Sequence, residues 1–205
     1  MLGPMTSEVR DAYAARAVEY GEHLGSMAAV HPSDRQLVDD WADGLDGEIV
    51  DAGCGPGHWT HHLTTRGLAC RGVDQVSGFV DLARASYPGV RFEVGDLDAL
   101  EAAPASVGGV LAWYSLIHHE PDAIQRPLAE FARVLRPGGG LLLGFFDGPM
   151  VEPFDHAVTR AHRWPIDRMA EEARVAGFEI VETRRRTGVG HRPHAAIVAR
   201  RLEGG

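Results

Sequence analysis

The sequence predicts an α/β fold in which a doubly wound, mostly parallel sheet carries helices on both faces. From residue 48 onward, short apolar runs alternate with amphipathic helical patterns. The connections between these runs and patterns are short, which favours parallel strands joined by right-handed crossovers. A chain of 205 residues, 44% of them hydrophobic, is long enough for one domain with a full core.

Five apolar runs are predicted to form the parallel strands. They are Glu48–Ala52, Ala69–Asp74, Val90–Val94, Gly109–Tyr114 and Leu141–Phe146. Two further strands, near residues 178–184 and 195–201, are too close in sequence for a parallel crossover. We therefore expect these two strands to pair antiparallel.

The helices are predicted from apolar residues spaced three or four apart and from Gly or Pro at the helix ends. The helix that carries Leu128 is expected to end at Pro137. Two starts for it are open, because Asp122 with Gln125 resembles a capping box, whereas Pro127 favours a later start.

Further helices are expected on either side of this core. Ser33 with Gln36 matches a capping box ahead of the first strand, and Pro165 opens a helix after the fifth strand. We expect N-terminal helices within residues 1–46 and the α/β core within residues 47–205. The two parts are predicted to form one domain, residues 1–205.

The composition of the chain indicates which kinds of molecule it binds. A formal net charge of −9 opposes binding to nucleic acid, which draws on clustered Lys and Arg, and favours a small-molecule substrate. The basic run Arg184 to Arg186 is interpreted as solvated charges with no assigned role. No apolar stretch is long enough for a membrane helix, and two cysteines are too few for a disulfide framework. We expect a cytoplasmic protein without a membrane partner.

Open α/β sheets bind ligands at the carboxyl ends of their strands, and three strand ends carry suggestive residues. The first strand runs into a glycine-rich turn, residues 51–57, whose backbone N–H groups can approach a ligand. Asp74 ends the second strand, and its carboxylate can accept hydrogen bonds from the hydroxyls of a ribose. Asp96 follows the third strand and can accept from an exocyclic amine.

These motifs, in this order, resemble those of the class I S-adenosylmethionine-dependent methyltransferases, in particular the small-molecule members. The similarity extends from Ile49 to Phe146 and includes the run Leu135-Arg136-Pro137-Gly138-Gly139 before the fifth strand. It implies a Rossmann-like, seven-stranded sheet of order 3-2-1-4-5-7-6 with strand 7 antiparallel. It also implies S-adenosylmethionine as cofactor and methyl transfer to a small-molecule acceptor.

The same resemblance assigns the cofactor site position by position. The residues implied to bind the cofactor are Asp51, Gly53, Cys54, Gly55, Gly57, His58, Asp74, Gln75, Asp96, Leu97, Trp113 and Tyr114.

Aromatic and histidine side chains are the candidates for the acceptor pocket. His118 and His119 follow the fourth strand, where the methyl group should point, and His118 is the candidate general base. Tyr13 and Tyr20 lie on a predicted N-terminal helix, where two roles are open: their helical spacing fits core packing, and the resemblance implies a lid over the site. His58 and His62 have the spacing of metal ligands, but no Glu follows His58, and we expect no metal site.

Two other function classes remain open at this stage. A protein that binds S-adenosylmethionine without turnover would keep the same motifs. A nicotinamide-dependent oxidoreductase would share the sheet and the ribose carboxylate, but it normally has GxGxxG, and this chain has GxGxG.

Overall fold

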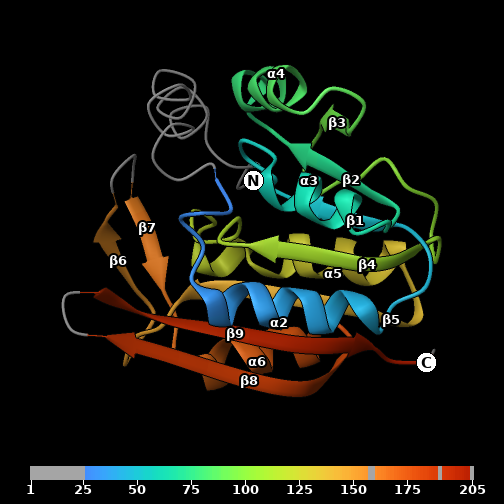
Figure 1. Ribbon diagram of the computed structural model, residues 1–205. Coiled ribbons are helices and arrows are strands. Elements are labelled where there is room, and N and C mark those ends of the chain that lie inside the picture. Colours follow the sequence, from blue (N-terminus) through green and yellow to red (C-terminus); the bar gives the residue numbers. More distant parts are fainter. Residues whose placement is uncertain (1–25, 157–159, 189–190, 204–205) are drawn as a thin grey trace.

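The computed structural model describes residues 26–156, 160–188 and 191–203, and these residues form a layered α/β structure (Figure 1). Its main sheet has the strand order β3-β2-β1-β4-β5-β9-β8. The parallel strands are β1 (Ile49–Ala52), β2 (Cys70–Asp74), β3 (Arg91–Val94), β4 (Val107–Trp113) and β5 (Leu135–Phe146).

The last two strands, β8 (Phe178–Gly188) and β9 (His191–Arg201), complete this sheet. β9 pairs antiparallel with both β5 and β8. The expected strand order and the antiparallel seventh strand are therefore confirmed. A separate hairpin of β6 (Glu152–Asp155) and β7 (Arg160–Arg163) lies near the carboxyl ends of the parallel strands (Figure 1).

Helices cover both faces of the sheet (Figure 1). On one face lie α2 (Pro32–Asp43) and α3 (His58–Thr65), and on the other lie α5 (Gln125–Val134) and α6 (Ile166–Val175). The remaining described α-helix, α4 (Ser77–Ser86), packs on β2 and β3.

Successive side chains of the central strands point to opposite faces of the sheet, because a strand has a two-residue period. Leu111 and Leu142 pack with α2 and α3, whereas Val110 and Leu141 pack with α5 and α6. Among the described residues, no helix has the length and apolar character that crossing a bilayer demands.

The start of α2 differs from the prediction. Its N-cap is His31, whose Nδ1 accepts from the backbone N–H of Ser33 at 3.2 Å. Pro32 supplies a preset φ at the first helical position, so the helix starts before Ser33. Gln36 donates to Asp40 rather than closing a capping box. The predicted capping box of Ser33 with Gln36 is therefore wrong.

Both ends of α5 differ in detail as well. A 3-10 turn, Pro121–Ala123, precedes it, and α5 begins at Gln125. Pro127 lies in the first turn, where its missing N–H has no intrahelical partner to lose. The helix ends at Val134 rather than at Pro137, because Leu135 is already extended and pairs with Val107 in the sheet.

The predicted helix behind Pro165 is confirmed as α6, and Gly177 follows it with a φ of +95°. Residues 1–25 lie outside the described residues, so the N-terminal helix that carries Tyr13 and Tyr20, the lid and the domain boundary at residue 46 stay predictions.

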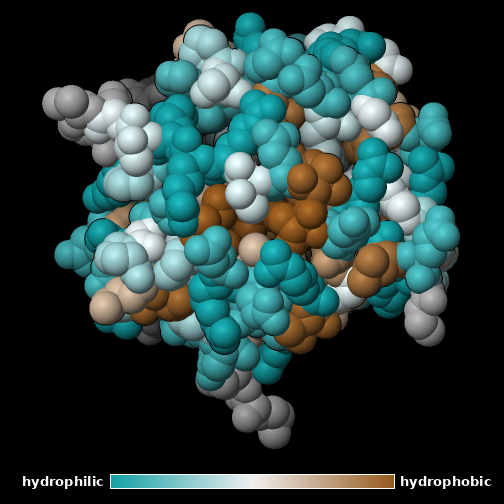
Figure 2. Space-filling view, turned by 90° about the horizontal axis from the view of Figure 1, so that it is seen from below, coloured by the Kyte–Doolittle hydropathy of each residue, from teal (hydrophilic) through white to brown (hydrophobic). Residues whose placement is uncertain are grey.

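The strand β8 is an edge of the main sheet, and Figure 2 views the molecule from that side. Hydrophobic side chains gather near the middle of this face, and hydrophilic ones surround them. On β8 itself, Val181 is 55% exposed, while Arg184 pairs with Glu182 and Arg185 pairs with Asp147. Such charges protect an edge strand from pairing with another chain.

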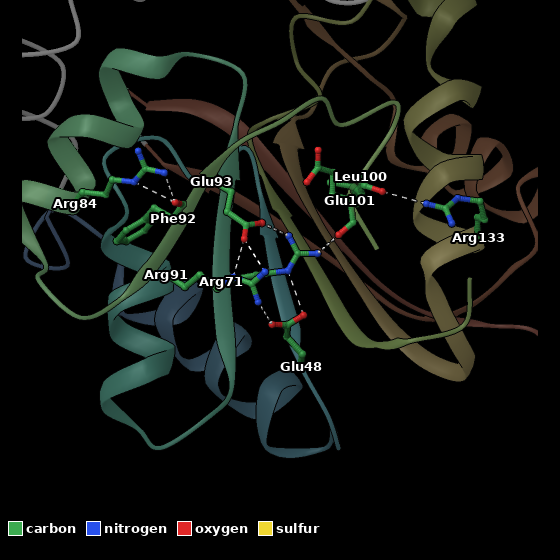
Figure 3. Close-up of polar contacts among 9 residues, drawn as sticks. All are labelled: Glu48, Arg71, Arg84, Arg91, Phe92, Glu93, Leu100, Glu101 and Arg133. Carbon is green, nitrogen blue, oxygen red and sulfur yellow. Dashed lines mark hydrogen bonds and ion pairs between the residues drawn. The ribbon is translucent and has the colours of Figure 1, made fainter. Parts of the chain in front are cut away.

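A polar network fixes the amino-terminal ends of β1, β2 and β3, away from their carboxyl ends (Figure 3). Its centre is Arg71, whose side chain is 2% exposed and contacts Glu48 at 3.1 Å and Glu93 at 2.9 Å. The same guanidinium donates to the carbonyl of Glu101 at 3.3 Å. Arg91 contacts the same two carboxylates from the surface, with its side chain 61% exposed.

We expect Arg71→Met to lower the free energy of unfolding by about 2–3 kcal/mol, because two half-buried carboxylates and a carbonyl lose their donor. The control Arg91→Met should change it by less than about 0.5 kcal/mol, since its ion pairs are exposed. Urea denaturation followed by tryptophan fluorescence measures both. Equal losses in the two variants would contradict the central place of Arg71.

Candidate ligand site at the carboxyl edge of the sheet

A cavity of about 700 Å³ lies at the carboxyl ends of the parallel strands and extends to β8, β9 and α2. Ten of the predicted cofactor-site residues line it, as does His118. Those ten are Asp51, Gly53, Cys54, Gly55, His58, Asp74, Gln75, Leu97, Trp113 and Tyr114.

The turn after β1 needs glycine for steric reasons. Gly53 has a φ of +81°, and a Cβ on it would lie 2.2 Å from the Cβ of Ser115. Gly57 has a φ of +86° and is the N-cap of α3, where a Cβ would meet the ring of Phe92 at 2.6 Å. Gly53 lines the cavity, whereas Gly57 shapes the turn without lining it.

The carboxylate of Asp74 connects two strand-end loops. Its Oδ2 accepts from the backbone N–H of Gly55, and its Oδ1 accepts from that of Val76, each at 2.8 Å. Burial raises the pKa of Asp74 to about 6, against the lowering effect of these hydrogen bonds. The carboxylate is thus held at the cavity wall by backbone groups on both sides.

Asp51 adds a second buried carboxylate to this wall. It accepts from Thr60 Oγ1 at 2.6 Å, and burial raises its pKa to about 7. Burial disfavours the ionised form of both carboxyl groups, and a nearby positive charge would stabilise that form. A ligand with a positively charged centre suits this end of the cavity better than the negatively charged pyrophosphate of a dinucleotide.

Asp96 lies behind the wall rather than on it. It accepts from Gln75 Nε2 at 3.3 Å and from the backbone N–H of Asp98 at 3.0 Å. Gln75 and Leu97 line the cavity, but Asp96 is not among the lining residues.

At the other end of the cavity, His118 is fixed by its own hydrogen bond. Its Nδ1 lies 2.7 Å from the carbonyl oxygen of Arg160, so Nδ1 carries the proton and the basic nitrogen of the neutral ring is Nε2. Burial lowers the pKa of His118 to about 4, which keeps the imidazole uncharged.

Tyr114 ends β4 in a left-handed conformation, with a φ of +59°. A non-glycine residue in this region carries a backbone cost and is found at functional positions. Its hydroxyl forms a hydrogen bond with His194 Nδ1 of β9, and its ring contacts Trp113 and Phe146. The strained backbone places the ring at the cavity wall.

The other predicted acceptor-pocket residues have different outcomes. His119 is buried and bonds to Asp98 at 3.3 Å, and it does not line the cavity. Tyr13 and Tyr20 lie outside the described residues. The segment between β5 and α6 supplies a further wall residue, His156.

Sequence reasoning missed an ion pair at the cavity. Arg186 of β8 contacts Asp34 of α2 through two hydrogen bonds, 2.7 Å and 3.2 Å long, and both side chains line the cavity. His194 was also not predicted as a lining residue, whereas Ser115, which the resemblance places with Trp113 and Tyr114 at the methionine end, does line the cavity. The basic run Arg184 to Arg186 is visible in the sequence. Only Arg186 reaches the cavity, because β8 continues past the carboxyl end of β4.

Four buried polar atoms of cavity-lining residues have no hydrogen-bond partner within the described part of the chain. They are Ser115 Oγ, His58 Nδ1, Trp59 Nε1 and His156 Nδ1. Buried polar groups are normally paired, so these atoms indicate a polar ligand at both ends of the cavity. His62, the second residue of the rejected metal pair, bonds to Asp39 at 2.7 Å.

Comparison with known proteins gives a consistent result. Residues 49–139 match a family model described as "Methyltransferase domain". A malonyl-[acyl-carrier protein] O-methyltransferase of Serratia marcescens is 29% identical over 132 residues, which are 64% of this chain and 46% of that protein. An S-adenosyl-L-methionine-dependent Diels-Alderase of Talaromyces variabilis is 37% identical over 103 residues, 46% of this chain and 35% of that one. The chain thus spans less than half the length of these two curated relatives.

Among solved structures, the chain is similar to a Burkholderia thailandensis 1,6-didemethyltoxoflavin-N1-methyltransferase with bound 1,6-didemethyltoxoflavin and S-adenosylhomocysteine. The TM-score is 0.76 at 22% identity, covering 99% of this chain and 94% of that chain. At this identity the similarity establishes the fold.

The raised pKa of Asp51 predicts a pH-dependent stability. The native state holds the proton more tightly than the unfolded state does, so ionisation destabilises the fold as pH rises from about 4 to about 7. Asp51→Asn cannot ionise. Its free energy of unfolding relative to the wild type should therefore rise over this range by about 2–4 kcal/mol and level off above pH 7.

Urea denaturation of the ligand-free proteins between pH 4 and pH 8 measures this difference. Asp46→Asn is the control, because its side chain is 95% exposed and the substitution should change stability little at any pH. A pH-independent difference between Asp51→Asn and the wild type would show that Asp51 is ionised in the native state without cost.

Proposed function

Because residues 49–139 match a methyltransferase-domain model and the chain shares the fold of a solved methyltransferase, we propose that it belongs to the class I S-adenosylmethionine-dependent methyltransferases and transfers a methyl group from S-adenosylmethionine to a small-molecule acceptor. One observation carries this proposal. A single cavity joins the glycine turn and the two buried carboxylates at one end to His118 and a group of aromatic rings at the other.

The proposed cofactor contacts follow from this layout. Asp74 would accept from the ribose hydroxyls, because its oxygens keep acceptor capacity beyond the two backbone bonds. Leu97 and Gln75 would contact the adenine side, with Asp96 acting through Gln75. The loop from Asp51 to His58, with Trp113 and Tyr114, would hold the methionine part.

S-adenosylmethionine supplies a methyl group on a positively charged sulfur, and transfer neutralises that charge. The protein's part is to align the acceptor and to exclude water, which supplies much of the acceleration in such displacements. We propose that His118 Nε2 takes the acceptor's proton. The pKa near 4 makes His118 a weak base, so its contribution should be at the low end for general base catalysis.

The acceptors named for the relatives differ chemically, a malonyl group in one and 1,6-didemethyltoxoflavin in another. They therefore do not identify the acceptor of this chain. The net charge of −9 supports a small molecule over nucleic acid. We also propose a cytoplasmic location, where the two free cysteines stay reduced.

A second candidate is a protein that binds S-adenosylmethionine and does not transfer its methyl group. The relative named as a Diels-Alderase favours keeping this alternative. An oxidoreductase is disfavoured by the GxGxG pattern of the turn and by Asp51, a second buried carboxylate at the turn where a pyrophosphate would lie.

The turnover test incubates the protein with S-adenosylmethionine and a panel of phenols, amines, thiols and carboxylic acids. We expect acceptor-dependent release of S-adenosylhomocysteine, detected by mass spectrometry, together with a methylated product. Tight cofactor binding without release across the panel would favour the second candidate.

Asp74→Asn should weaken S-adenosylhomocysteine binding about 10-fold to 100-fold, because a charged acceptor to the ribose is lost. Asn keeps one acceptor for the backbone N–H groups, so this change disturbs the loops less than Ala would. Calorimetry gives the affinity, and circular dichroism checks the fold. Asp81→Asn, exposed on α4, is the control. A folded Asp74→Asn protein with wild-type affinity would rule out the ribose contact.

His118→Ala should lower turnover about 100-fold with little change in cofactor affinity, and its residual rate should rise with pH as the acceptor ionises unaided. His119→Ala serves as the control, since His119 does not line the cavity. Similar small effects of the two substitutions on turnover would remove the base assignment, and the reaction would then depend on alignment alone.

A further inference from the structure

The acceptor end of the cavity is walled by five rings in mutual contact. Tyr114 and Phe146 lie 5.0 Å apart between ring centroids, and Phe146 lies 5.4 Å from His194 and 5.7 Å from His156. The ring of His118 lies 5.7 Å from that of His156. All five residues line the cavity, and we call them the ring wall.

Four members of the ring wall, Tyr114, Phe146, His118 and His156, carry no charge. Burial lowers the pKa of His156, as it does that of His118, so both imidazoles stay neutral at physiological pH. The hydroxyl of Tyr114 is bonded to His194, and burial raises the pKa of Tyr114 well above its usual range.

The charged side chains near the ring wall are already neutralised. Among the described residues that line this end of the cavity, the charged ones are Asp34 and Arg186, and they pair with each other through two hydrogen bonds. An acceptor with a carboxylate or a phosphate would therefore meet a pair whose net charge is zero, because Asp34 already offsets the charge of Arg186.

A cavity wall built of uncharged aromatic rings favours uncharged aromatic ligands. Aromatic rings attract one another in offset and edge-to-face geometries beyond the burial of their area. His156 Nδ1, which has no hydrogen-bond partner among the described residues, offers a polar atom beside His118 for one hydroxyl or ring N–H.

From the ring wall and the closed Asp34–Arg186 pair, we infer that the methyl acceptor is an uncharged planar aromatic compound that reacts through an O–H or ring N–H, and that Phe146 selects for it. This inference rests on the proposed function. The methyl carbon bonds to the acceptor atom, the carbon–sulfur bond breaks with its electron pair on sulfur, and the acceptor's proton goes to His118.

Three probes of one skeleton test the inference. They are 2-naphthol, which is planar and uncharged, 2-decalol, which is saturated, and 2-naphthoate, which is planar and anionic. Each is titrated calorimetrically into wild-type protein saturated with S-adenosylhomocysteine at pH 7. We expect 2-naphthol to bind at least tenfold more tightly than either of the others.

Two variants then locate the binding. Phe146→Leu should weaken 2-naphthol binding about threefold to tenfold and leave S-adenosylhomocysteine binding unchanged. Phe154→Leu is the matched control, because Phe154 packs edge-on against Phe146 but does not line the cavity. It should leave both affinities as they are.

The inference is overturned if 2-naphthol fails to bind more tightly than both other probes, or if Phe154→Leu weakens it as much as Phe146→Leu does. In each case S-adenosylhomocysteine binding would leave the proposed function intact. If S-adenosylhomocysteine itself does not bind, the proposed function falls, and this inference falls with it.

Discussion

The shape of the cavity depends on two hydrogen bonds that the carboxylate of Asp74 accepts, one from the loop after β1 and one from the loop after β2. The two oxygens of Asp74 hold Gly55 and Val76 by their backbone N–H groups. The glycine turn can follow that path because Gly53 passes too close to Ser115 for any side chain. The cost is a buried carboxylate whose pKa rises to about 6. A native protein tolerates such a cost where function needs the group.

The two ends of the cavity differ in their electrostatics. Asp51 and Asp74 make one end suited to positive charge, whereas the ring wall and the closed Asp34–Arg186 pair make the other end neutral. The methyl group of the proposed donor would sit where these two environments meet. This division explains how one cavity can take a polar cofactor and an uncharged acceptor side by side.

Sequence reasoning predicted the sheet because its signals are local and repeated: apolar strands, glycine stops and the short β8–β9 connection. It misplaced the start of α2 and the end of α5, where single residues such as Pro32 and Leu135 decide between neighbouring positions. At the site, strand-end residues such as Asp74 were predictable because topology alone brings strand ends together. Arg186 and His194 were not predictable, since their contact with the cavity depends on how far β8 and β9 continue past the carboxyl end of β4 and on side-chain packing.

The central claim is that the carboxyl edge of this sheet binds a sulfonium nucleoside rather than a dinucleotide. Isothermal titration calorimetry of the wild-type protein with S-adenosylmethionine and, separately, with NAD tests it most directly. The account predicts saturable binding of S-adenosylmethionine at one site per chain and no saturable heat with NAD, whose pyrophosphate would face Asp51 and Asp74. Saturable binding of NAD without binding of S-adenosylmethionine would contradict it.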